Sequence, residues 1–338
     1  MKVLGFLRNN TPADLDAVAY YRVYRPLREV NRQGNGITAR VVSNIEVVGM
    51  TDDDLGGQDV YVMSRMYHRD CDEFIAKIHE TGGVLVLDAD DDLTEAYRVV
   101  SGRGREFREV LGKVDYVTTS TQPLAALFGQ YTQRPPVVLP NHIDSAWMQS
   151  LQARRFTDDF TLGFSGSPTH WGDWYLPSAP FLRITQDYAV TPVLHGDMPS
   201  YFKAVDWVDK VLQLDSVPFS LYPLMLRQFD AVLCAVAEHD PFNDGKSNVK
   251  ALECMALGVV PICSRFQPYM DLADAGAPVV IIEETSRDGW YAAMQKVVTD
   301  KDFCAEIKAR GPTWVYEHRD ITTGYKQWEK AYRSFANG

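Results

Sequence analysis

Apolar and polar positions alternate along the chain with two different periods. Short runs rich in valine, isoleucine and leucine recur, and between them apolar residues lie three or four positions apart. The runs predict buried strands and the wider spacing predicts amphipathic helices. Strands that alternate with helices are typical of parallel sheets covered on both faces. We expect strands at residues 3–7, 37–42, 60–63, 84–87, 116–119, 137–139, 160–164, 190–194, 211–214, 231–236, 259–263 and 278–282.

The alternation breaks once, near residues 142–159, where a turn and a short helix are followed by polar residues. We therefore predict two doubly wound, Rossmann-like domains of the α/β class, over 1–145 and 159–318. Such sheets bind ligands beyond the carboxyl ends of their strands, so we expect these ends to face a cleft. The main helices are expected at residues 18–30, 74–78, 107–114, 124–128, 181–188, 221–229, 248–257, 288–299, 302–310 and 321–335.

Composition narrows the classes of function. With 338 residues and 46% hydrophobic residues the chain can build two cores, and disorder is not indicated. A formal charge of −11 argues against a broad nucleic-acid or anionic-membrane surface. No apolar run is long enough to span a membrane, and the N-terminus does not resemble a signal peptide. Cys234 and Cys263 lie in apolar runs and are interpreted as core residues, so we expect a soluble, cytoplasmic protein.

The stretch from Asp240 to Glu253 carries the most specific chemistry. It follows the strand at 231–236 and ends as a helix, and its loop contains Gly245-Lys246-Ser247-Asn248. If Ser247 or Asn248 caps that helix, the first-turn N–H groups and Lys246 form a site for a phosphate. Glu253 lies further along the helix and can reach a neutral hydroxyl of the same ligand. The alternative is a capped surface helix. Asp240 stands where a P-loop needs glycine.

Four further loops follow predicted strands. The one at residues 140–144 is a hinge-like turn, and the other three carry candidate chemistry. Tyr21 and Arg22 follow a long polar loop, and Arg22 is either an anion ligand or an exposed helix residue. Four carboxylates between Asp88 and Asp92 indicate either a divalent metal or an acidic turn, and we favour the turn without metal. Neither a Gly-x-Ser-x-Gly elbow nor a Gly-x-Gly-x-x-Gly loop after the first strand is present. This counts against an α/β-hydrolase and a dinucleotide oxidoreductase.

The third loop, Gly166-Ser167-Pro168-Thr169-His170, follows the first strand of the second domain. Its small residues allow a ligand to approach the backbone. His170 can donate a hydrogen bond to a phosphate or sugar oxygen, or it has a structural role.

Taken together, five segments resemble a nucleotide-sugar glycosyltransferase of the GT-B fold. The chain is most similar to a divergent branch of the group that carries a Glu-x7-Glu motif. The segments span nearly the whole chain, and the last two are the most specific. They are residues 20–26 (Tyr-Tyr-Arg-Val-Tyr-Arg-Pro), 87–93, 139–144, 166–173, and 242–261 with Asn-Asp-Gly-Lys-Ser-Asn and Glu253.

The resemblance implies roles for individual residues. The second glutamate of the motif, which maps to Glu253, holds the donor ribose. The first glutamate maps to Gly245, a departure that leaves Asp244 as the nearest substitute. The resemblance further implies catalytic roles for His170, Lys246 and Asp244, donor contacts from Gly166, Ser167, Lys246, Ser247, Asn248, Lys250 and Glu253, and acceptor or phosphate contacts from Tyr21 and Arg22.

The activity that the resemblance implies is a hexosyltransferase-like transfer from a UDP-, GDP- or dTDP-sugar, with no obligatory cofactor or metal and with retention of configuration. Domain 1–145 would bind the acceptor, domain 159–318 the donor, and a helix over 319–338 would return to the first domain. A glycan, lipid, protein or modified nucleic acid all remain open as acceptor. The alternatives are a non-catalytic nucleotide-sugar or glycan-binding protein, and an epimerase or phosphorylase of the same fold.

Overall fold

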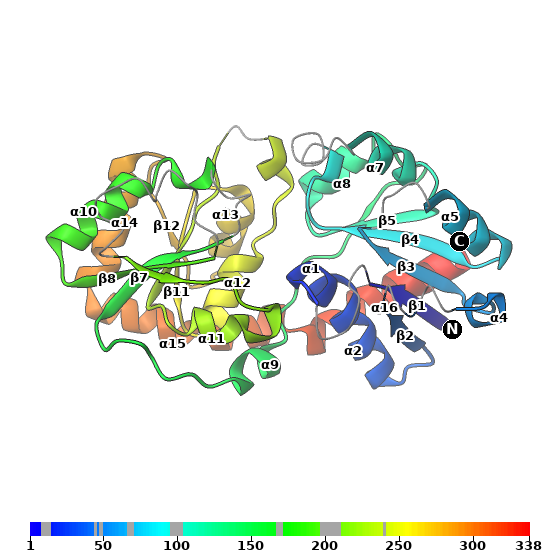
Figure 1. Cartoon of the computed structure of the whole chain (residues 1–338), viewed down its shortest axis with the longest axis horizontal. Coiled ribbons are helices and arrows are strands. Elements are labelled where there is room, and N and C mark those ends of the chain that lie inside the picture. Colours follow the sequence, from blue (N-terminus) through cyan, green and yellow to red (C-terminus); the bar gives the residue numbers. More distant parts are fainter. Residues whose placement is uncertain are drawn as a thin grey trace. The chain divides into compact units, whose positions relative to one another are not determined.

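The chain folds into two compact units, labelled by element in Figure 1. The computed structural model describes residues 1–7, 15–43, 46, 50–65, 71–94, 104–166, 172–196, 211–238 and 241–338. The first unit consists of Met1–His142, Asp240–Ser247 and Ile321–Gly338, and the second of Ile143–His239 and Asn248–Asp320. The segment 240–247 thus groups with the first unit, although we placed it within the second domain.

Both units confirm the predicted α/β fold with two Rossmann-like sheets. The sheet of the first unit is parallel, with the strand order β2-β1-β3-β4-β5-β6. Every strand expected in this part of the chain is present. Its strands are β1 (Lys2–Phe6), β2 (Thr38–Val42), β3 (Val60–Ser64), β4 (Val84–Ala89), β5 (Tyr116–Thr119) and β6 (Val137–Val138).

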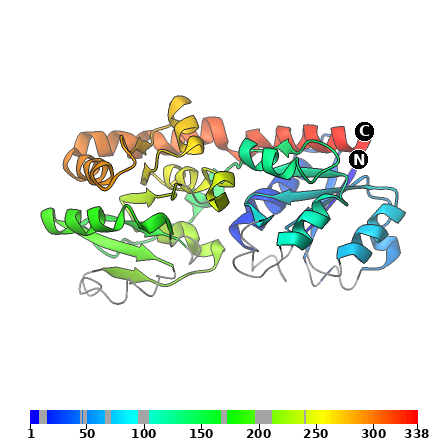
Figure 2. The same ribbon diagram turned by 90° about the horizontal axis from the view of Figure 1, so that it is seen from above.

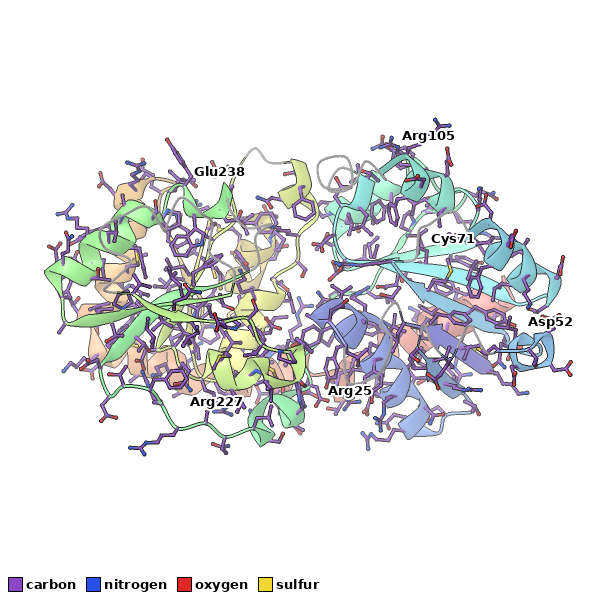
Figure 3. The ribbon with its side chains drawn as sticks, in the orientation of Figure 1. Arg25, Asp52, Cys71, Arg105, Arg227 and Glu238 are labelled. Carbon is purple, nitrogen blue, oxygen red and sulfur yellow. The ribbon has the colours of Figure 1, made fainter. Side chains whose placement is uncertain are left out.

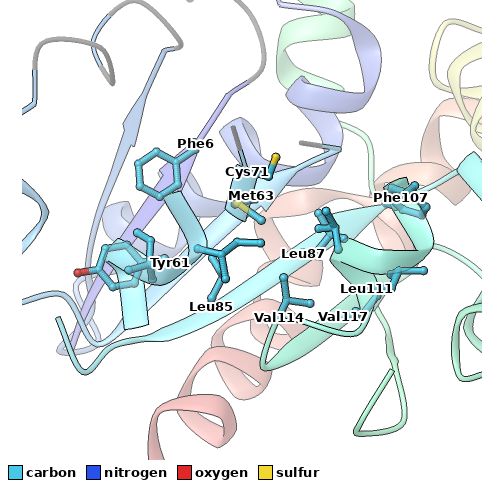
Figure 4. Close-up of a cluster of buried hydrophobic side chains, with 14 of the residues drawn as sticks. Phe6, Tyr61, Met63, Cys71, Leu85, Leu87, Phe107, Leu111, Val114 and Val117 are labelled. Atoms are coloured by element: carbon cyan, nitrogen blue, oxygen red, sulfur yellow. The ribbon is translucent and has the colours of Figure 1, made fainter. Parts of the chain in front are cut away.

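Helices cover both faces of the first sheet, as the near-continuous apolar strands require. One apolar cluster joins the strands to α5, α7 and α8, and Figure 4 shows part of it around Tyr61 and Leu87. The other cluster joins them to α2 and α16. In this unit the helical elements are α1 (Ala17–Ala19), the π-helix η2 (Tyr20–Tyr24), α2 (Arg25–Gln33), α4 (Asp52–Leu55), α5 (Cys71–Glu80), α7 (Gly104–Leu111), α8 (Gln122–Phe128), η8 (Pro241–Gly245) and α16 (Ile321–Asn337).

Polar side chains lie outside these clusters. Figure 3 labels Asp52 and Arg105 on the outside of the first unit, and both side chains are 83% exposed. Cys71, which is labelled in the same figure, is fully buried. All five cysteines are buried and outside disulfides, and the burial of Cys234 and Cys263 confirms their interpretation as core residues.

The second unit contains the remaining six strands in the order β12-β11-β10-β7-β8-β9, again all parallel. They are β7 (Phe160–Ser165), β8 (Val190–His195), β9 (Leu212–Leu214), β10 (Ala231–Cys234), β11 (Val260–Cys263) and β12 (Val280–Ile281). In this unit the helical elements are α9 (Ser145–Ser150), η4 (Gly172–Trp174), α10 (Ser178–Asp187), η7 (Phe219–Leu221), α11 (Tyr222–Leu226), α12 (Val249–Ala256), α13 (Gln267–Asp274), α14 (Arg287–Thr299) and α15 (Lys301–Arg319), most of them visible in Figure 2.

The strand order of the second unit locates its ligand-binding edge. Counted within the unit from β9 to β12, the order is 3-2-1-4-5-6, which is that of dinucleotide-binding domains. The direction of winding reverses between β7 and β10. Ligands of such sheets bind beyond the carboxyl ends of the strands at this reversal. The loops that follow β7 and β10 are the two that the sequence singled out as most specific.

Helices α13 and α15 are among the elements that differ from the prediction. Helix α13 was missed, although Pro268 in its first turn is a common signal of a helix start. Helix α15 continues to Arg319 through Gly311 and Pro312, where we expected an end at residue 310. A Cβ at Gly311 would lie 2.8 Å from the carbonyl oxygen of Met255, so glycine allows α15 to approach α12 closely. This packing stabilises a helix that local propensity alone would end.

Candidate functional site

The reversal in the second sheet brings together the ends of β7 and β10. Ser165 is the last residue of β7, and Gly166 follows it with its N–H bonded to the carbonyl oxygen of His195 at 3.1 Å. Gly196, after β8, has φ of +101°, and a Cβ there would lie 2.1 Å from the carbonyl oxygen of Gly166. Only glycine permits this close approach of two backbones. The predicted ligands Ser167 and His170 lie outside the described residues.

Helix α12 carries the predicted contacts that follow β10. Glu253 is only 5% exposed, although it is charged, so its carboxylate belongs to the interior of the second unit. The Nζ of Lys250 lies 4.5 Å from the centre of the Phe164 ring, a cation–π contact with strand β7. Glu253 and Lys250 therefore both belong to the part of the second unit that adjoins β7 and β10.

Of the two expected helix caps, Asn248 does not form one. It occupies the N-cap position of α12, but its side chain makes no capping hydrogen bond. Its Nδ2 instead donates to the carbonyl oxygen of Pro268 at 3.1 Å. The hydroxyl of Ser247 accepts a hydrogen bond from Nδ2 of Asn141 at 2.9 Å. Both polar residues thus anchor neighbouring loops.

Three polar residues near Glu253 were not singled out from the sequence. The hydroxyl of Ser165 lies 2.9 Å from Nδ1 of His195 and donates to the hydroxyl of Tyr222 at 3.3 Å. Burial raises the pKa of Tyr222, and the charge of Glu253 raises it further. Burial lowers the pKa of His195, so its ring is neutral near pH 7. Ser165 and His195 are the polar last residues of apolar strands, and this position is the signal that could have identified them.

The segment 240–247 is held by residues of the first unit. Thr121, at the start of α8, donates its hydroxyl to the carbonyl oxygen of Gly245 at 2.9 Å. A Cβ at Gly245 would lie 2.9 Å from Cδ1 of Leu124, so a glutamate at this position would have to displace that side chain. Lys246 is 8% exposed, and its Nζ lies 5.2 Å from the centre of the Phe242 ring. Asp244, by contrast, is exposed.

Arg22 is buried within the first unit and is 0% exposed. Its Nε and Nη2 donate to the two carboxylate oxygens of Asp88 at 3.0 and 2.8 Å. Its Nη1 donates to Asn141 at 2.9 Å and to the carbonyl oxygen of Leu139. Burial alone would lower the pKa of Arg22, but the charge and hydrogen bonds of Asp88 outweigh it and raise the pKa. Since Tyr21 is also buried, at 2% exposed, the geometry favours structural roles over the predicted acceptor or phosphate contacts.

The acidic segment after β4 is bound by side chains of its own unit. Asp88 pairs with Arg22 and also accepts from the Thr118 hydroxyl at 2.6 Å. Asp92 accepts from the backbone N–H and the hydroxyl of Thr94 at 2.8 and 2.6 Å. Asp90 and Asp91 both pair with Arg65. Within the described residues, no group of three histidine, cysteine or acidic side chains is arranged to hold a metal ion.

Comparison with solved structures defines the fold further. HepE of Anabaena, solved in complex with UDP and glucose, superposes with a TM-score of 0.69 over 99% of this chain and 100% of its own, at 14% identity. The whole chain has the GT-B fold. Sucrose-phosphate synthase of Thermosynechococcus elongatus gives 0.68 over 100% of both chains at 11% identity. A putative UDP-N-acetylglucosamine 2-epimerase of Listeria monocytogenes gives 0.59 over 98% of this chain and 96% of its own, at 10% identity.

The chain matches no protein-family model and no curated protein sequence. The fold is thus established by structure, whereas membership of the Glu-x7-Glu group stays a prediction.

A separate finding concerns membranes. Over the described part of the chain, every helix is too short or too polar for a membrane crossing.

Proposed function

We propose that this protein is a glycosyltransferase that transfers a sugar from a nucleotide-sugar donor to an acceptor. The observation that carries the proposal is Glu253, a carboxylate 5% exposed on the helix after β10, where the second sheet reverses its winding. A carboxylate at this edge suits the hydroxyls of a ribose. HepE, which shares the fold, is solved with UDP and with UDP-glucose, so a UDP-sugar is the first donor to test.

Lys246 and the first-turn N–H groups of α12 are the proposed contacts of the donor diphosphate. Lys246 precedes the helix directly, and the positive end of the helix dipole favours an anion at its N-terminus. Negative charge develops on the leaving diphosphate, so preplaced cations and N–H groups stabilise the transition state more than the ground state. Gly166, Ser167, Ser247, Asn248 and Lys250 are proposed as further donor contacts, and His170 and Asp244 as catalytic groups.

Transfer without a metal is part of the proposal. Asp88, Asp90 and Asp91 are paired with Arg22 or Arg65, and Asp92 accepts two hydrogen bonds from Thr94. These contacts support a structural role for the acidic segment. Retention of configuration and an acceptor bound by the first unit rest on the family resemblance alone, and a cytoplasmic location rests on the composition of the sequence. All three stay predictions.

A non-catalytic nucleotide-sugar-binding protein is the second candidate, and Gly245 favours it. The carbonyl oxygen and the α-carbon of Gly245 pack against α8, where the resemblance calls for a glutamate near the sugar. Turnover separates the two candidates. We expect UDP and either free sugar or a glycosylated product to form from a UDP-sugar in the presence of EDTA. Binding without any turnover of UDP-, GDP- and dTDP-sugars would identify a binding protein, and donor isomerisation would identify an epimerase.

The diphosphate assignment is tested by calorimetry with UDP and uridine on the wild type and on Lys246→Met. One charge-assisted hydrogen bond contributes about 1.5–3 kcal/mol, so the affinity for UDP should fall roughly ten- to a hundredfold. Uridine has no phosphate, so its affinity should stay the same. Equal weakening of both ligands, or of neither, would show that Lys246 does not bind the diphosphate.

A further inference from the structure

Two carboxylates at the end of β4 share a single arginine. Nη2 of Arg65 contacts both Oδ1 of Asp90 and Oδ2 of Asp91. Two negative charges and one positive charge leave one negative charge within this group. Asp88 does not take part, because its carboxylate is paired with Arg22. The group of Arg65, Asp90 and Asp91 therefore carries a net negative charge that a second cation can balance.

The backbone of Arg65 is held in an uncommon conformation beside the acidic segment. Arg65 has φ of +50°, the left-handed region that residues other than glycine seldom adopt. Its N–H donates to the carbonyl oxygen of Asp88 at 3.1 Å. A conformation of this kind persists only where surrounding contacts enforce it, and such residues cluster at functional sites.

Lys246 is the cation that completes the group. Gly245 lies against the acidic segment, since a Cβ there would be 3.7 Å from the backbone nitrogen of Asp92. The hydrogen bond from Thr121 to the carbonyl oxygen of Gly245 holds the loop in this position. Lys246 comes next in the chain. Burial raises the pKa of Asp91, and the charges of Arg65 and Lys246 act against that rise. Asp91 keeps 29% of its side chain exposed, so this carboxylate can be reached from the surface of the unit.

We propose that Asp91 is a positioning residue that competes with the donor diphosphate for Lys246. The inference rests on the proposed function, in which Lys246 binds that diphosphate. While the donor is absent, the carboxylate of Asp91 balances the charge of Lys246. When the diphosphate arrives, it shares the ammonium group with Asp91 and is held less tightly than by an unshared lysine. After transfer, Asp91 favours release of the nucleoside diphosphate, because it restores the charge balance of Lys246.

Asp91→Asn tests this directly, because it removes the charge and keeps the shape of the side chain. We expect the affinity for UDP to rise about fivefold, the effect of one unit charge at close range in water, and the affinity for uridine to stay the same. In turnover, KM for the UDP-sugar should fall and kcat should fall with it, since the product leaves more slowly. Asp72→Asn is the matched control, because it removes the same charge from a surface pair with Lys113 in the same unit.

The variant Lys246→Met separates failure of this inference from failure of the proposed function. If Lys246→Met leaves UDP binding unchanged, the diphosphate assignment is wrong and the inference is overturned with it. If Lys246→Met weakens UDP selectively but Asp91→Asn leaves UDP binding unchanged or weaker, the inference alone is overturned. In the double variant the gain from Asp91→Asn should shrink below twofold. An undiminished gain would show that Asp91 acts without Lys246, which also overturns the proposal. Retained uridine binding confirms that each variant is folded.

Discussion

Glu253 is an almost completely buried carboxylate with other polar side chains near it. Its neighbour Tyr222 is buried and linked by hydrogen bonding to Ser165, which also contacts His195. A buried charge is costly unless polar groups compensate for it. A cluster of this kind at the reversal point of a sheet is typical of a binding site rather than of a packed core.

Replacement of Glu253 should therefore affect binding in a recognisable way. Glu253→Gln removes a charge-assisted hydrogen bond to the ribose, so affinity should fall by more than tenfold. UDP and uridine should weaken equally, because both contain the ribose, whereas Lys246→Met affects UDP alone. Calorimetry measures both ligands, and Glu306→Gln on the exposed face of α15 serves as the control. Unchanged affinity in a folded Glu253→Gln protein would contradict the ribose assignment.

The environment of a single residue could be predicted where the local sequence pattern determines its burial. It could not be predicted where a residue far away in the sequence determines its contacts. The cysteines in apolar strands were correctly assigned to the core. Arg22 was expected to be either an anion ligand or an exposed helix residue. It is buried and pairs with Asp88, 66 positions away, and no local pattern shows this pairing. Asn248 lies at the helix start as expected, but Pro268 attracts its side chain. The predicted roles of Lys246 and Glu253 remain to be tested.

At the scale of elements, all the expected strands are present because apolar runs bounded by polar loops are a local signal. Helix ends were less predictable, since tertiary packing sets them. Helix α15 passes through Gly311 and Pro312, two residues that normally end a helix. Its contact with α12, for which a side chain at Gly311 would leave no room, explains the difference.

The close approach of α12 and α15 predicts whether a substitution at Gly311 stabilises or destabilises the protein. By helix propensity alone, Gly311→Ala should stabilise the protein by roughly 0.5–1 kcal/mol. The added Cβ would instead lie 2.8 Å from the carbonyl oxygen of Met255, and backbone cannot move aside as a side chain can. We expect a net loss of about 1–3 kcal/mol in the free energy of unfolding, measured by chemical denaturation. A stabilised variant would show that α12 and α15 are not in close contact at this point.

Asp230 connects the start of β10 with Arg155 and with Lys308 of α15, and these contacts predict that stability depends on pH. It lies at the start of β10 and accepts from Arg155 at 2.8 and 2.6 Å and from Lys308 of α15 at 2.6 Å. Burial alone would raise the pKa of Asp230, but the hydrogen bonds from Arg155 and Lys308 outweigh it and lower the pKa. Its contribution to stability is therefore complete well above the unfolded pKa of about 3.9 and is lost as the pH falls below that value.

Asp230→Asn should be less stable than the wild type at pH 7, and the difference should shrink as the pH falls from about 5 towards 2. Denaturant unfolding at a series of pH values measures it, and Asp187→Asn, at an exposed surface pair, is the control. A difference that stayed constant across this range would mean that the charge of Asp230 is not what stabilises the contact.

At the scale of the whole molecule, the units do not follow the order of the chain. The first unit uses three separate segments, and the last of them contributes α16. The side chain of Trp328 on this helix is fully buried; it lies 5.7 Å from the Arg22 guanidinium and 5.4 Å, ring centre to ring centre, from His142. A sequence pattern shows the aromatic stripe of such a helix but not which of two sheets it covers. The short segment 240–247 carried no such signal at all.

The assignment of α16 to the first unit predicts which of the two units a substitution in this helix destabilises. Trp328→Ala should lower the free energy of unfolding of the first unit by about 3–5 kcal/mol, because the cavity lies in its core. Amide hydrogen exchange should show faster opening in β1 and β3 and unchanged protection in β10 and β11. Tyr316→Ala, at a side chain 61% exposed on α15, should change neither. Uniform loss of protection in both sheets would show that the two units unfold as one.

The return of α16 to the first sheet also bears on how the protein is made. Domains generally fold as units during synthesis, and the amino-terminal one is usually complete first. Here the second unit has all of its segments once Asp320 has been translated, whereas the first unit still awaits Ile321–Gly338. Until those residues leave the ribosome, the sheet face that Trp328 covers is uncovered in the nascent chain. The unit translated first is therefore the last to mature.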